Sequence, residues 1–164
     1  KERYTLARQF YVEDKTTEWA ESINIYTVDM QKVLILPKMT IKNSFFVSRL
    51  VVFNETFAPL HNGENLCLIW HEAISGRQAA DVASSFYNII KSADSKVMSF
   101  IFWSDNCSAQ NKNWTLYSAF ITMVNAEWGP NDITIKYFEP GHFFMKADSV
   151  HGQIGKEWKK GKKF

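Results

Sequence analysis

The stretch from Val97 to Trp103, VMSFIFW, is almost wholly apolar, and the polar pair Ser104-Asp105 follows it. A run of this kind is typical of a central strand that is covered on both faces. The chain has 164 residues, of which 46% are hydrophobic, so it is long enough to bury such a sheet within one domain. The sequence therefore predicts an α/β protein with helices on both faces of its sheet.

Alternating and apolar segments indicate four further strands. Ile23–Met30 alternates in polarity, and Asp29 lies near its end. The other strands are expected at Phe45–Ala58, Leu66–Glu72 and Ile133–Phe138. Helices are expected within residues 1–22, after Ser75-Gly76, over Trp114–Asn125 and from Asp148-Ser149 onwards, with a polar loop over Asn106–Asn113. This order predicts a mixed five-stranded sheet, in which three antiparallel strands precede alternating helices and strands.

Charge and cysteine content exclude several classes of protein. The formal net charge is +2, so the chain as a whole is not strongly basic as many nucleic-acid-binding proteins are. Basic residues are concentrated at the end, where Lys156 to Phe164 contains five lysines and one glutamate. Two cysteines are too few for a disulfide framework and indicate an intracellular protein with reduced thiols. No signal peptide and no apolar run of about 18 residues are present, which predicts a soluble chain without a membrane segment. The start at Lys1 leads us to expect a fragment of a longer protein with flanking domains.

Two aspartates occur at strand ends. The strand order and these two carboxylates predict that Ile23–Met30 and Val97–Trp103 are adjacent and parallel, in which case Asp29 and Asp105 converge at one edge of the sheet. Paired carboxylates repel each other unless a cation lies between them, and oxygen ligands favour Mg²⁺ or Mn²⁺. Two such ions about 4 Å apart can act together on a phosphodiester. Asp148 is the candidate for a third acid. The alternative is that Asp105 starts a turn and Asp148 caps a helix.

Other polar residues are candidates for supporting roles. His142 and His151 bracket Asp148, and Asp148 and His151 share a helix face because they are three residues apart. We expect His151 to support a carboxylate rather than bind zinc, although a zinc site with another ligand stays open. A final set consists of candidate substrate or supporting residues: Glu72, Gln110, Asn111, Lys112 and His142.

Three strings resemble an uncharacterised family of transposon-derived proteins from insect and other animal genomes. They are VDMQKVLILP from Val28, WSDNCSAQNKNW from Trp103 and EPGHFFMKADSVHGQI from Glu139. The resemblance covers about residues 23 to 160 and implies a ribonuclease H-like domain of the acidic-triad transposase and integrase class. It implies that Asp29, Asp105 and an acid on the last helix bind metal. We accordingly divide the chain into a leading helix or linker (1–22), this domain (23–160) and a basic tail (161–164).

The chain departs from this family at Gly155, where relatives often carry glutamate. If that glutamate is the third ligand, this chain has lost it, whereas a site that uses Asp148 is intact. The resemblance implies a core that cleaves or joins DNA with two Mg²⁺ or Mn²⁺ ions in the nucleus. Two alternatives stay open, namely an inactive descendant that binds nucleic acid or protein, and a nuclease of DNA or RNA processing. The oligomeric state is open as well.

Overall fold

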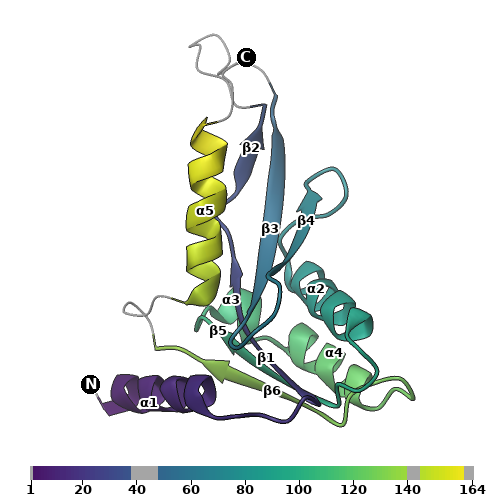
Figure 1. Ribbon diagram of the computed structural model, residues 1–164. Helices are drawn as coiled ribbons and strands as arrows, with labels where there is room; N and C mark the ends of the chain where they lie inside the picture. The colour runs from purple at the N-terminus through teal and green to yellow at the C-terminus, as the bar shows by residue number, and fades with distance from the viewer. Residues whose placement is uncertain (1, 38–47, 140–144, 161–164) are drawn as a thin grey trace.

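The structure, a computed structural model, describes residues 2–37, 48–139 and 145–160. Its centre is a six-stranded mixed sheet in the order β2-β3-β1-β5-β6 (Figure 1). β2 and β1 pair with successive parts of one side of β3, and β4 pairs with the other side of β3. The strands are β1 (Ile23–Met30), β2 (Leu34–Leu36), β3 (Leu50–Pro59), β4 (Leu66–His71), β5 (Ser99–Ser104) and β6 (Asp132–Tyr137). The helices are α1 (Glu2–Thr16), α2 (Ala79–Ser92), α3 (Ser108–Asn111), α4 (Trp114–Val124) and α5 (Lys146–Lys160). Within the described ranges, no helix has the length and apolar character needed to cross a bilayer.

Two apolar cores lie on the two faces of the sheet. On one face, under α2 and α4, the rings of Phe86 and Phe102 meet edge-on with centroids 4.8 Å apart. On the other face, under α1 and α5, Tyr11 meets Trp103 edge-on at 5.4 Å, and Ala147 is fully buried. Phe102 and Trp103 are neighbours in β5 and point to opposite faces. The apolar run at Val97–Trp103 is therefore a central strand covered on both sides, as predicted.

The predicted adjacency of the first and fourth long strands is confirmed. β1 and β5 are parallel, and their register ends with Val28 beside Ser104. β1 is antiparallel to β3, and β3 is antiparallel to β4. Asp29 and Asp105 each follow the last registered pair by one residue. The backbone thus brings both aspartates to the same edge of the sheet.

Several boundaries differ from those expected. The five expected strands are joined by a sixth, β2, whose three residues are too few to show an alternation in the sequence. The structure describes β3 from Leu50, and the expected start at Phe45 lies outside the described residues. The predicted polar loop after Asp105 contains the short helix α3. α5 begins at Lys146, two residues before the expected cap, so Asp148 lies within the first turn.

The leading helix α1 is fixed to the sheet through a buried carboxylate. Asp14 Oδ2 accepts hydrogen bonds from Trp103 Nε1 at 2.8 Å and from Lys136 Nζ at 2.7 Å. Because the charge of Asp14 is paired, its burial does not carry the cost of an isolated ion. α1 therefore contributes Tyr11 and Asp14 to the core. The division of the chain at residue 22 stays a prediction.

Candidate functional site

The alternation of β1 directs Asp29 toward the face that α5 covers. Ile25 packs in the core under α1 and α5, whereas Val28 packs in the opposite core. Asp29 is an even number of residues from Ile25 and so shares its face. Its side chain is partly buried, with 23% of its surface exposed. Asp29 is therefore an acid at the end of a buried strand, directly below a helix.

The first turn of α5 is fixed above β1 by hydrogen bonds to the sheet. Thr27 Oγ1 accepts from Ala147 N at 3.2 Å and donates to Ala58 O at 3.3 Å. Lys146 Nζ donates to Pro59 O at 2.6 Å. These contacts set the height of the helix over the sheet. The next residues on the same helix face, Asp148 and His151, consequently lie above the end of β1.

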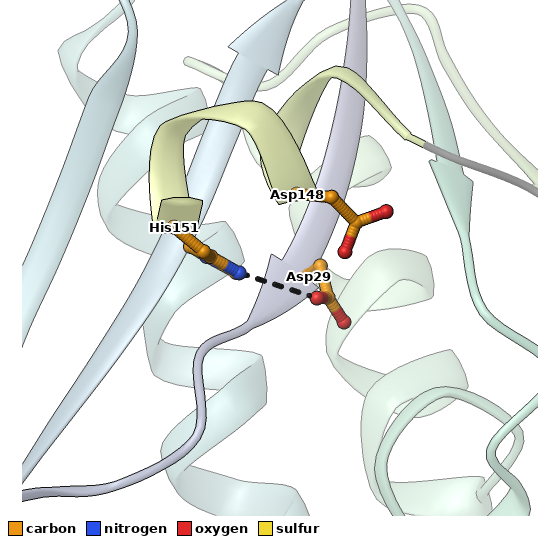
Figure 2. A group of neighbouring side chains, drawn as sticks. All are labelled: Asp29, Asp148 and His151. Atoms are coloured by element: carbon orange, nitrogen blue, oxygen red, sulfur yellow. Dashed lines mark ion pairs between the residues drawn. The ribbon is translucent and has the colours of Figure 1, made fainter. Parts of the chain in front are cut away.

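Asp29, Asp148 and His151 converge in one cluster (Figure 2). One ligand atom from each residue lies within 4.8 Å of the others. A divalent ion with bonds of about 2.1 Å holds its ligand atoms roughly 3 to 4.2 Å apart, so the side chains fit such an ion after shifts below about 1 Å. Two carboxylates and one imidazole suit Mn²⁺, Mg²⁺ or Zn²⁺ by donor type. These three residues are the candidate metal centre.

The carboxylates of this cluster repel each other, and this affects Asp148. Burial raises the pKa of Asp148, and the negative charge of Asp29 raises it further. The backbone N–H of Met145, which donates to Asp148 Oδ2 at 2.8 Å, and nearby His151 act in the opposite direction. Asp148 therefore caps its helix from inside the first turn while it faces Asp29. The cap and ligand roles are compatible, because the cap occupies only Oδ2.

His151 is held with one nitrogen toward Asp29. Its Nδ1 lies 3.4 Å from Asp29 Oδ2. Its Nε2 is buried and has no hydrogen-bond partner among the described residues. The sequence predicts a supporting role for His151, and its place in the cluster makes it a candidate ligand as well.

A buried polar network supports the turn that carries His151. Gln31 Nε2 donates to the backbone oxygen of His151 at 3.4 Å. Asn54 Nδ2 donates to Gln31 Oε1 at 3.0 Å and to Thr56 Oγ1 at 3.2 Å. The role of these residues was not evident from the sequence. The signal was the polar triplet Asn54-Glu55-Thr56 inside an otherwise apolar strand.

Glu55 is a further buried polar residue whose role was not evident from the sequence. Its side chain is fully buried, and it is in register with Met30, the residue after Asp29. Burial raises the pKa of Glu55 to about 8; a hydrogen bond with Ser85 lowers it, and the charge of Asp29 raises it. Glu55 Oε2 has no partner among the described residues. Glu55 thus favours its protonated form at neutral pH, and its pairing with Met30 places it on the face of the sheet under α2, opposite the face that carries Asp29.

Asp105 does not join the cluster. Its Oδ1 accepts from Asn111 Nδ2 at 2.5 Å and from the backbone N–H of Cys107 at 3.2 Å. The second contact is the turn that was the alternative interpretation of this aspartate. The backbone of Asp105 lies beside that of Asp29, whereas its side chain accepts a hydrogen bond from Asn111 of α3. A metal-binding role for Asp105 stays a prediction.

The other candidates lie at several places. Gln110 Nε2 lies 3.8 Å from Met30 Sδ, and Lys112 Nζ lies 4.4 Å from the ring centroid of Tyr137. Glu72 Oε1 accepts from Val51 N at 2.9 Å and so fixes β3 to the end of β4 rather than reaching the cluster. His142 lies outside the described residues.

Two further acids near α5, Glu139 and Glu157, could replace Asp148 as a third acid, and neither is at the cluster. Glu157 pairs with Lys160 at 2.7 Å on the exposed side of α5, and Glu139 lines a cavity of about 460 Å³ between α1 and β6. A Cβ added at Gly155 meets nothing within 4 Å. A glutamate at position 155 therefore fits without strain, one turn beyond His151 on the same helix face.

No protein-family model and no curated protein matches the chain. Among solved structures, it is similar to a chain in the crystal structure of the Mos1 Strand Transfer Complex, with a TM-score of 0.50 and 11% sequence identity. The similarity covers 95% of this chain and 47% of that chain, so this chain spans about half the length of that one. Together with the sheet order, this similarity shows a ribonuclease H-like, transposase-like fold.

Proposed function

We propose that this chain is a transposase-like catalytic core that cleaves or joins DNA phosphodiester bonds with Mg²⁺ or Mn²⁺. The observation that carries the proposal is the convergence of Asp29, Asp148 and His151 at the edge of a ribonuclease H-like sheet. The cluster combines residues from β1 and from a helix more than a hundred positions later in the chain. Exposed acidic groups are common on protein surfaces without a metal ion. This cluster differs from them because a buried polar network holds the backbone of His151.

Each residue has a defined role in this proposal. Asp29 and Asp148 bind one ion together with His151, and Asp105 is the candidate for a second ion because its backbone lies beside that of Asp29. A divalent ion held by these residues would supply activation of an attacking oxygen and stabilisation of charge on the leaving oxygen. The network below α5 keeps His151 in place, because it fixes the backbone of that turn.

The substrate side of the proposal concerns the loop after β5. Gln110, Asn111 and Lys112 lie at the same edge as Asp105, where the cation of Lys112 can contact a phosphate. DNA is the expected partner, and action on chromosomal DNA places the protein in the nucleus. A nuclease of RNA or DNA processing has the same chemistry and differs in the substrate it prefers.

An inactive descendant is the second candidate, and one observation favours it. The hydrogen bond from Asn111 holds Asp105 away from the cluster, so the described arrangement forms one candidate ion site instead of two. The glycine at position 155 and the net charge of +2 are consistent with this alternative. Such a protein binds a single ion and does not cleave DNA.

Cleavage assays separate these candidates. We would incubate the chain with labelled single-stranded DNA, duplex DNA and RNA in Mn²⁺ or Mg²⁺, using the wild type, Asp29→Asn and Glu157→Gln. Glu157 is the matched control because it lies on the exposed side of α5. We expect cleavage of DNA by the wild type and the control, and a loss of at least about 100-fold in Asp29→Asn. Equal cleavage by wild type and Asp29→Asn excludes the proposed site, and ion binding without cleavage identifies the inactive descendant.

A further inference from the structure

One aromatic side chain near the loop that follows Asp105 is largely exposed to solvent. Trp114, the first residue of α4, is 81% exposed, more than any other large hydrophobic side chain in the described residues. An indole is a large apolar surface that proteins usually bury. The arrangement of residues around it determines what could cover it.

Trp114 is linked to Asp105 through a continuous series of contacts. Asn111 Nδ2 donates to Asp105 Oδ1, and the backbone oxygen of Asn111 accepts from Tyr137 Oη at 2.5 Å. Because Tyr137 donates that bond, Tyr117 donates to Tyr137 Oη, at 3.0 Å. The ring of Tyr117 meets that of Trp114 edge-on, with centroids 6.5 Å apart and planes at 86°. These contacts fix Trp114 relative to the candidate catalytic edge.

One cation lies close to Trp114 in the chain. Lys112, two residues earlier, places its ammonium group 4.4 Å from the ring centroid of Tyr137. The side chain of Asn113 caps α4 by accepting from Leu116 N at 2.9 Å, which orders the turn between the lysine and the tryptophan. Lys112 and the exposed ring of Trp114 are two residues apart in the chain and are joined by this ordered turn. Proteins bind single-stranded nucleic acid with aromatic rings on which bases stack and with cations that contact the backbone.

We propose that Trp114 and Lys112 form a binding site for an unpaired nucleotide of the DNA substrate, with its base stacked on Trp114 and its phosphate contacted by Lys112. The ligand is a single-stranded segment, because bases inside a duplex already stack on each other and cannot cover an indole. The inference rests on the proposed function for the identity of the nucleic acid. It extends the substrate path from the cluster under α5, past Asp105, to the start of α4.

Binding of a labelled oligo-dT of about 12 nucleotides tests this site by fluorescence anisotropy. The variants are Trp114→Ala, Trp114→Phe, Lys112→Gln and Ile121→Ala. Ile121 is the matched control, since it is 61% exposed and lies two turns further along the same helix. Melting curves check that each variant is folded. Because Trp114 is exposed, its substitution should leave the melting temperature almost unchanged.

We expect Trp114→Ala to weaken single-strand binding by about 5- to 100-fold, and we expect Trp114→Phe to retain most of it because phenylalanine keeps an aromatic face. Lys112→Gln should lower the dependence of log affinity on log salt by about 0.7. Wild-type affinity in Trp114→Ala, or an equal loss in Ile121→Ala, overturns the proposal. A change in oligomeric state in Trp114→Ala with unchanged DNA affinity also overturns it, in favour of a protein contact.

Mn²⁺ binding in the same variants separates this inference from the proposed function. Trp114→Ala should bind Mn²⁺ like the wild type, because the indole is not part of the cluster. Unchanged single-strand affinity in Trp114→Ala, in a chain that binds Mn²⁺ and cleaves DNA, overturns the Trp114 site alone. Weakened single-strand affinity in Trp114→Ala, in a chain that neither binds Mn²⁺ nor cleaves DNA, overturns the proposed function alone.

Discussion

His151 Nδ1 lies 3.4 Å from Asp29 Oδ2, so an imidazole from α5 faces the acid at the end of β1. The candidate centre thus combines oxygen and nitrogen ligands in place of carboxylates alone. Imidazole suits transition metals better than Mg²⁺. This pair is the basis of the first prediction, which concerns metal preference.

His151→Gln should reduce the preference of the site for Mn²⁺ over Mg²⁺. The amide keeps a polar group of similar reach but removes the nitrogen ligand that distinguishes the two ions. We expect Mn²⁺ affinity to fall about 10- to 100-fold and Mg²⁺ affinity to change less. Calorimetric titrations with both ions measure the ratio. An unchanged ratio shows that His151 does not contact the ion.

Asp148→Asn separates the two roles of this residue. Its Oδ2 accepts from Met145 N, and an asparagine oxygen can accept the same bond. The variant also removes the charge that opposes Asp29, so we expect the free energy of unfolding without metal to change by less than about 1 kcal/mol. Metal affinity should nevertheless fall by at least about 10-fold.

Denaturation and Mn²⁺ titration of Asp148→Asn should therefore give different outcomes. A loss of stability with normal metal affinity would falsify the ligand role and leave Asp148 as a helix cap alone. Ser149→Ala, one residue further along α5, is the control for a general effect of substitution in the first turn.

Glu55 makes stability depend on pH. Its pKa is raised by burial from 4.5 to about 8, so the unfolded chain ionises at lower pH than the folded chain. The stability that the protonated carboxyl contributes is full below about pH 4.5, falls as pH rises through 8 and is then lost. Glu55→Gln removes this dependence. By pH 9 the variant should have gained about 4 kcal/mol relative to the wild type, compared with their difference at pH 4.

Urea denaturation of both proteins between pH 4 and pH 9 measures this difference. Parallel stability curves for wild type and Glu55→Gln would show that Glu55 ionises normally. Because the charge of Asp29 contributes to the raised pKa of Glu55, Mn²⁺ bound at Asp29 should shift the wild-type transition to lower pH.

Gly155→Glu tests the third-acid alternative. The position has open space and lies one turn beyond His151, so the side chain can be added without strain. A glutamate replaces a helix-interior glycine and should stabilise the chain by up to about 1 kcal/mol. If position 155 completes the site, Mn²⁺ affinity and DNA cleavage should also rise. A gain in stability alone assigns the glycine to the helix surface.

Much of the architecture could be predicted from local patterns. The apolar run at Val97–Trp103 and the alternation of Ile23–Met30 indicated two central strands, and their adjacency followed from the element order. The spacing of three between Asp148 and His151 correctly put them on one helix face, where both meet Asp29. These features depend on the period of a helix or strand, which the sequence carries directly.

The side-chain arrangement at the site could not be predicted in the same way. Asp105 is turned by a hydrogen bond from Asn111, and this contact depends on the short helix α3, whose four residues have no recognisable period. Glu55 is buried because α2 and β4 cover β3, which is a result of tertiary packing. The strand β2 is likewise defined by its pairing with β3 rather than by its own sequence.

The most direct test of the account is a calorimetric titration of the metal-free chain with Mn²⁺, comparing the wild type with Asp29→Asn. Asp29 is shared by every version of the candidate centre, and Glu157→Gln serves as the control on α5. We predict that the wild type and the control bind Mn²⁺ with the same affinity and that Asp29→Asn binds at least about 10-fold more weakly. Equal Mn²⁺ affinity in all three proteins, or no binding by the wild type, would contradict a metal centre at Asp29, Asp148 and His151.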